Sequence, residues 1–163
     1  MTKTLSAITL GLLTSLSSLQ VLADQANDIS VSNPYAREVP PGAPASASFM
    51  TLKNSSGQAI KLVQADSKVA KAVELHTHTN DKGVMRMRQV ASFEIPANGQ
   101  AHLKPGGDHI MLINLHKPLK AGQTVSVQLQ FEDGSKKQVD MPVKSVMQKK
   151  GSMNHDMHQH HHH

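Results

Sequence analysis

Two short stretches of this chain gather side chains that can bind a soft metal ion. Residues 74–90 read ELHTHTNDKGVMRMRQV and contain His76, His78, Met85 and Met87, while residues 105–115 read PGGDHIMLINL and contain His109 and Met111. Imidazole binds several transition metals, whereas a thioether is soft and uncharged and favours Cu(I) over zinc, calcium or magnesium. The chain has no cysteine. Nitrogen and thioether donors without a thiolate therefore indicate Cu(I).

The spacing of these donors predicts how strands would present them. Successive side chains of a strand point to opposite faces, so two donors separated by one residue share a face. The stretch NDKG at residues 80–83 is typical of a hairpin turn and predicts that His76 or His78 lies near Met85 or Met87. Two glycines just before His109 allow a sharp turn into the third pair.

The elements that would position these donors are strands. From about residue 29 to residue 143, short alternating segments are separated by Gly- and Pro-containing turns, which predicts an all-β sandwich with little helix. TVSVQLQF, EDGS and KKQVDMPV, at residues 124–143, predict a hairpin with Asp-Gly at its turn. Other predicted strands cover residues 45–53, 59–66, 72–79, 84–90, 92–96 and 109–115. Met50 and Met141 are expected in the core, and His102 and His116 in solvated loops.

The two ends of the chain differ from the part between them. Residues 1–23 combine Lys3, a short apolar run and Val-Leu-Ala before Asp24, which is typical of a secretory signal peptide. The copper-binding domain is predicted at residues 24–144, in the periplasm, without a membrane span in the mature protein. Residues 145–163 form a predicted disordered tail rich in His and Met. Its terminal HQHHHH also fits a purification tag, but the upstream SMNHDMH favours a native tail.

Composition excludes several classes of function. With no Trp, one Tyr and three Phe, the chain offers almost nothing on which bases could stack, and its net charge of +5 is spread along the sequence. Nucleic-acid binding is therefore not expected. The absence of cysteine excludes thiol redox chemistry and a blue copper centre. No Ser-His-Asp or paired-carboxylate arrangement is present, so an enzyme is not expected.

The donor spacing resembles that of the periplasmic copper chaperones called PCu(A)C. Their signature is a histidine, ten residues, a methionine, twenty-one residues, and His-x-Met, and His76, Met87, His109 and Met111 fit every position. The resemblance covers roughly residues 28–143. It implies a cupredoxin-like, Greek-key β-sandwich that binds one Cu(I) at an exposed edge through these four residues. It also implies copper delivery for assembly of the binuclear copper centre of cytochrome c oxidase. Thr77 stands where the family often has a methionine.

The remaining donors are candidates for accessory roles. His78 and Met85 are spare donors beside the main set. The tail donors would form a second, looser site more tolerant of Cu(II), because imidazole dominates there. They are Met153, His155, Met157, His158, His160, His161, His162 and His163.

Of three functions considered on sequence alone, we favour the first. The first is a metallochaperone that passes Cu(I) to the copper-accepting subunit of cytochrome c oxidase or to another copper chaperone. The second is a periplasmic copper buffer or resistance protein without a dedicated delivery partner. The third is a β-sandwich interaction module whose His and Met residues are incidental.

Overall fold

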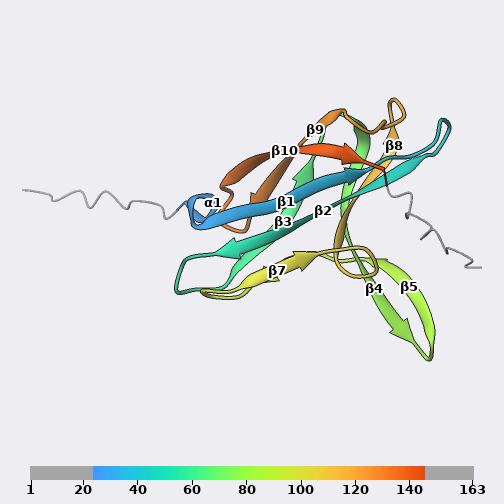
Figure 1. Cartoon of the computed structure of the whole chain (residues 1–163). Coiled ribbons are helices and arrows are strands. Elements are labelled where there is room, and N and C mark those ends of the chain that lie inside the picture. Colours follow the sequence, from blue (N-terminus) through green and yellow to red (C-terminus); the bar gives the residue numbers. More distant parts are fainter. Residues whose placement is uncertain (1–23, 146–163) are drawn as a thin grey trace, which may run out of the picture.

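The computed structural model describes residues 24–145 (Figure 1). The predicted signal peptide at 1–23 and the donors of the tail lie outside the described residues. A short helix, α1 (Gln25–Asp28), comes first. The strands that follow are β1 (Ile29–Arg37), β2 (Ala45–Asn54), β3 (Ile60–Asp66), β4 (Ala70–Asp81), β5 (Val84–Gln89), β6 (Phe93–Ile95), β7 (Gln100–Leu103), β8 (His109–Leu115), β9 (Thr124–Phe131) and β10 (Lys136–Lys144). The prediction of an all-β fold is confirmed.

The strands form two layers that meet along β1 and β10. Hydrogen-bonded neighbours follow the order β5-β4-β8-β2-β1-β10-β9-β3-β6, and β7 pairs with β2. The link between β1 and β10 is parallel and consists of the pairs Ala36–Val143 and Arg37–Lys144. The other strand pairs are antiparallel. Because the link is short, β5-β4-β8-β2-β1 and β10-β9-β3-β6 pack as two sheets around one core.

Alternating residues of the strands fill that core. On β9, Val125, Val127, Leu129 and Phe131 are buried while the residues between them face outward. Ile110 and Leu112 of β8 belong to the same hydrophobic cluster. Each fully buried side chain of this size contributes about 1.5–3 kcal/mol. Met50 and Met141 are both buried, which confirms their predicted place in the core.

Three elements were not among those predicted: α1, β1 and β7. The prediction that His102 lies in a loop is wrong, because β7 pairs with β2 and places His102 opposite Thr51. The Thr51 hydroxyl lies 3.2 Å from Nδ1 of His102. Only four residues long and set between two turn signals, β7 is too short for its alternation to be recognised. His116 does lie in an exposed loop, as expected.

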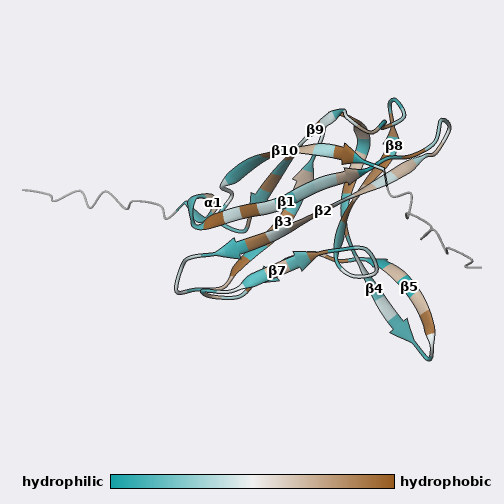
Figure 2. Cartoon of the chain, in the orientation of Figure 1, coloured by the Kyte–Doolittle hydropathy of each residue, from teal (hydrophilic) through white to brown (hydrophobic). Residues whose placement is uncertain are grey.

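The β4–β5 hairpin projects from one end of the molecule (Figure 1). Its turn places Lys82 and Gly83 at positive φ, and the Asn80 side chain accepts a 2.7 Å hydrogen bond from the Gly83 amide. β5 ends the sheet and all six of its residues are exposed. Figure 2 colours part of this outer strand as hydrophobic. Its exposed large hydrophobic residues are Val84, Met85 and Met87. Among residues 24–145, no helix is long and apolar enough to cross a membrane.

Candidate metal centre

Cross-strand pairing gathers the predicted donors of three strands on one face of the sheet. His76 of β4 pairs with His109 of β8, and His78 of β4 pairs with Met87 of β5. Directly opposite residues of an antiparallel pair project from the same face. Met111 lies two residues after His109 and therefore shares its face. The hairpin brings His78, rather than His76, directly opposite a methionine.

His109 is the buried centre of this group, with 3% of its surface exposed. Its Nδ1 lies 2.9 Å from the Gly107 carbonyl, and because a carbonyl only accepts, Nδ1 carries the proton. Burial lowers the pKa of His109, although the Gly107 carbonyl acts in the opposite direction. The neighbouring His78 and His76 lower this pKa further, while Asp108 raises it. The ring is therefore neutral at pH 7, with a lone pair on Nε2.

The lone pair of His109 faces the sulfur of Met87. Nε2 of His109 lies 3.1 Å from Sδ of Met87. In this tautomer neither atom carries a proton, so the contact is between two electron-pair donors and not a hydrogen bond. A soft cation bound by both atoms would remove the repulsion between them.

His78 lies beside His109 and uses the same backbone acceptor. Nδ1 of His78 lies 3.3 Å from the Gly107 carbonyl, and the two ring centres are 5.2 Å apart. One carbonyl thus fixes the orientation of both rings. His78, a spare donor in the sequence analysis, is closer to His109 than His76 is.

The loop that supplies this carbonyl is held from both sides. Gly106 has φ +78°, a backbone conformation that glycine adopts without strain. The amide of Lys104 donates to the Asp108 carbonyl at 2.8 Å, and the Gly107 amide donates to the Lys104 carbonyl at 3.0 Å. The Thr77 hydroxyl donates to the Asp108 carboxylate at 2.6 Å. Thr77 therefore fastens the loop to β4.

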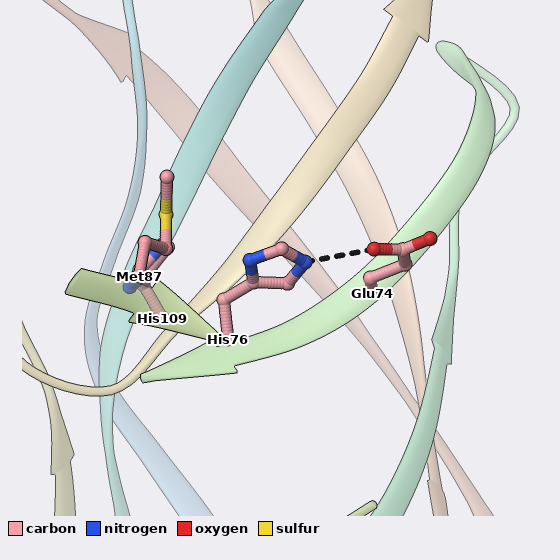
Figure 3. A network of polar contacts seen from close by, with 4 residues as sticks. All are labelled: Glu74, His76, Met87 and His109. Carbon is pink, nitrogen blue, oxygen red and sulfur yellow. Dashed lines mark hydrogen bonds and ion pairs between the residues drawn. The ribbon is translucent and has the colours of Figure 1, made fainter. Parts of the chain in front are cut away.

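His76 has a different hydrogen-bond partner. Its Nε2 is 2.7 Å from Oε2 of Glu74, and its ring centre is 5.9 Å from that of His109 (Figure 3). Only 14% of its side-chain surface is exposed. Sequence reasoning missed Glu74, although it shares the strand alternation of His76 and His78 and therefore their face.

A surface pocket opens onto part of this group. The pocket is lined by four donor residues, His78, Met87, His109 and Met111. Phe49 and Arg37 are among its other lining residues. Met87 is 48% exposed while His109 is buried, so the group runs from the surface into the interior and does not lie wholly at an exposed edge. Met85 is 56% exposed, pairs with Asn80 nearer the hairpin tip, and does not line the pocket.

Methionine is needed for this group to hold a metal ion. Within the described range 24–145, no cluster of three or more His, Cys, Asp or Glu side chains could hold one. The thioethers of Met87 and Met111 add the further donors, and such mixed nitrogen and thioether sets suit Cu(I).

Comparison with known proteins identifies the family to which the chain belongs. The profile of the LpqE-like family, described as "Putative lipoprotein LpqE-like", matches residues 29–143. "Putative lipoprotein Lxx21020" of Leifsonia xyli subsp. xyli (strain CTCB07) is 39% identical over 128 residues, which cover 78% of this chain and 76% of that protein. The chain belongs to the LpqE-like family, of the PCuAC type.

Solved structures agree with this family assignment. DR1885 of Deinococcus radiodurans, solved in solution with Cu(I), is 38% identical, with a TM-score of 0.59 over 77% of this chain and 87% of DR1885. Its apo form is 36% identical, with the same TM-score over 90% and 98% of the two chains. The copper-bound PCuAC domain of PmoF2 is 20% identical, with a TM-score of 0.62 over 72% and 93%, and shows the fold alone. The LpqE-like chain is thus homologous to copper-binding PCuAC domains.

Proposed function

We propose that this LpqE-like protein is a periplasmic metallochaperone that carries one Cu(I). The observation that carries the proposal is the 3.1 Å approach of His109 Nε2 to Met87 Sδ, in a pocket that Met111 also lines. Its ligands are His76, Met87, His109 and Met111, with His78 as an accessory donor. The Cu(I) form of DR1885, at 38% identity, supports the choice of metal. The signal-like sequence of residues 1–23 supports export to the periplasm.

The donor chemistry favours a carrier over a permanent holder of copper. Thioether and neutral imidazole bring no negative charge to the ion, so Cu(I) is held without a charge-neutralising thiolate. Because Met87 is about half exposed, an acceptor can reach the ion from the hairpin side while His109 still binds it. The destination that the family resemblance suggests is the copper-accepting subunit of cytochrome c oxidase, for its binuclear centre.

An anaerobic Cu(I) titration against a competing chelator tests the site. Met87→Leu keeps the size of the side chain but removes the thioether, and should weaken Cu(I) binding at least about tenfold, or about 1.4 kcal/mol. Met141→Leu is the matched control, because Met141 is fully buried in the core, and should leave the affinity unchanged. Equal affinity of Met87→Leu and the unchanged protein would remove Met87 from the site.

A copper buffer without a dedicated partner is the second candidate function. The His- and Met-rich sequence of residues 145–163 favours it, because such a segment adds metal capacity without a defined acceptor. Comparing the chain that ends at Lys150 with the full chain separates the two sites. A chaperone keeps its tight Cu(I) site after truncation and transfers the ion to the apo copper-accepting domain. Tight binding that disappears with the tail, or copper that leaves only for a small chelator, supports the buffer.

A further inference from the structure

Glu74 occupies a position beside the proposed copper site that the ligand set does not explain. It shares the face of His76 on β4 and pairs with Met111 across β4 and β8. Its Oε2 lies 2.7 Å from Nε2 of His76. An ionised carboxylate only accepts hydrogen bonds. Nε2 of His76 therefore carries the ring proton and donates a hydrogen bond to Glu74.

The second nitrogen of the His76 ring is therefore the informative atom. Nδ1 of His76 is buried and has no hydrogen-bond partner among the described residues. Burying a polar atom without a partner is unfavourable, and native proteins rarely do so without a reason such as a metal. With the proton on Nε2, the neutral ring has its lone pair on Nδ1. Figure 3 shows this nitrogen on the side of the ring that faces Met87 and His109, away from Glu74.

His109 is fixed in the opposite sense. Its Nδ1 donates to the Gly107 carbonyl, which leaves Nε2 as the atom that approaches Met87. The two rings, whose centres are 5.9 Å apart, thus offer different nitrogens to the space between them. The acceptors that set this difference are a side-chain carboxylate on β4 and a backbone carbonyl in the loop before β8.

We propose that Glu74 is a positioning residue that makes His76 bind Cu(I) through Nδ1, while His109 binds it through Nε2. This inference rests on the proposed copper site. Glu74 itself is not a ligand, because a hard carboxylate oxygen suits Cu(I) poorly. By accepting the Nε2 proton it fixes the tautomer and rotation of His76 and increases the basicity of Nδ1. It also places a negative charge beside an otherwise uncharged donor set.

The competing account is that Glu74 accepts the hydrogen bond of His76 only in the metal-free protein. In that account Cu(I) displaces the carboxylate and binds Nε2 after the ring rotates. The two accounts differ in which nitrogen of His76 binds Cu(I) and therefore changes its chemical shift on loading. Because Cu(I) is diamagnetic, both nitrogens can be followed directly by NMR.

The experiment is long-range proton–nitrogen NMR of the full chain with labelled histidine, before and after anaerobic loading with Cu(I). Metal-free protein should show His76 with its proton on Nε2. Loading should shift Nδ1 of His76 and Nε2 of His109 while Nε2 of His76 stays protonated. A shift of His76 at Nε2 with loss of that proton overturns the proposal.

Variants of Glu74 supply the second readout. Glu74→Ala should leave His76 as a mixture of tautomers in the metal-free protein and weaken Cu(I) binding about tenfold or more. Glu74→Gln retains an acceptor oxygen and should preserve the Nε2-protonated tautomer. Glu94→Ala, at an exposed position of β6, is the matched control and should change neither the tautomer nor the affinity. An unchanged tautomer and affinity in Glu74→Ala would contradict the proposal.

Failure of this inference differs from failure of the proposed function. If Cu(I) shifts His109 but neither nitrogen of His76, the copper site stands without the role given to Glu74. If no Cu(I) binds to the full chain, the proposed function fails and the inference fails with it.

Discussion

At the scale of single residues, the imidazoles of the candidate centre are oriented before any metal arrives. Glu74 engages one nitrogen of His76, and the Gly107 carbonyl accepts from both His78 and His109. A ring held in this way has little rotational freedom left to lose when it binds an ion, so less of the binding free energy is spent on ordering it. The methionines, with longer and less constrained side chains, supply the adaptable part of the set.

Asn54 is a single residue on which several loop contacts depend. It is fully buried, and its amide donates to the carbonyls of Gln58, Ile95 and Pro96 at 2.7, 3.2 and 3.2 Å. Its Oδ1 accepts from the amide and the hydroxyl of Ser56, both at 2.8 Å. Asn54→Ala removes all of these hydrogen bonds from a buried site and should lower the free energy of unfolding by about 3 kcal/mol.

Urea denaturation measures this loss. Asn27→Ala is the control, because Asn27 is exposed and its hydrogen bond to Asp24 is at the surface. The control should change the free energy of unfolding by less than about 0.5 kcal/mol. Similar midpoints for the two variants would show that the Asn54 contacts do not hold the fold together.

At the scale of elements, the loop before β8 couples backbone geometry to the site. Gly106→Ala places a side chain at φ +78°, where a Cβ meets no atom within 4 Å, so its effect is conformational and not steric. This strain should lower the free energy of unfolding by about 1–2 kcal/mol. It should also weaken Cu(I) binding about tenfold, because the Gly107 carbonyl that orients His78 and His109 moves.

Gly122→Ala is the control that separates the effect of backbone strain on stability from its effect on copper binding. Gly122 has φ +88° and equally open surroundings, but it precedes β9, away from the pocket. Denaturation should show a similar loss of stability in both variants, whereas a chelator competition should show weaker Cu(I) binding only in Gly106→Ala. Equal affinities would mean that the loop does not set the orientation of the two rings.

Strands with clear alternation could be predicted from the sequence. The β9–β10 hairpin was predicted with its turn, and Gly134 at that turn has φ +82°. The sequence pattern does not define β1, because Asn33-Pro34 interrupts its alternation. The structure has a register shift there, between Ser32 and Tyr35. The four residues of β7 become a strand only because β2 is available to pair with them.

The grouping of the candidate donors on one face was predictable, but the orientation of their side chains was not. Spacing places His76, His78 and Glu74 on one face of a strand. Whether His78 or His76 lies opposite Met87 depends on hairpin register, which the sequence left open. The shared use of the Gly107 carbonyl depends on contacts between β4 and a loop about thirty residues later in the chain, and no local pattern reports such contacts.

At the scale of the whole molecule, the first described residues are tied to the distant β9–β10 turn. The Gln25 amide donates to the Asp133 carboxylate at 2.8 Å, and the Ala26 amide donates to the Ser135 hydroxyl at 2.9 Å. Burial tends to raise the pKa of Asp133, but hydrogen bonds from Ser135 and Gln25 outweigh it and hold that pKa below its ordinary value of 3.8. The ionised form of the Asp133 carboxyl therefore stabilises the folded state.

This contribution to stability should depend on pH in one direction. It is present above the unfolded value of 3.8 and is lost as the pH falls below it through the lower folded pKa. Urea midpoints measured between about pH 5 and pH 2 should fall more steeply for the unchanged protein than for Asp133→Asn, which cannot ionise. Parallel curves would show that Asp133 does not contribute to acid sensitivity.

At the proposed copper site, the exposed β5 strand would link retention of the ion to a local opening equilibrium. β5 is paired only with β4, while His109 and Met111 belong to a strand paired on both sides. Segments with so few buried contacts open at a lower free energy than the whole domain, as amide hydrogen exchange reveals. Since Met87 lies on β5, lifting this strand alone would withdraw one proposed ligand and leave the core folded. We therefore expect bound copper to slow amide exchange most in the β4–β5 hairpin. The rate of copper release would then be set by the opening of this small part of the molecule.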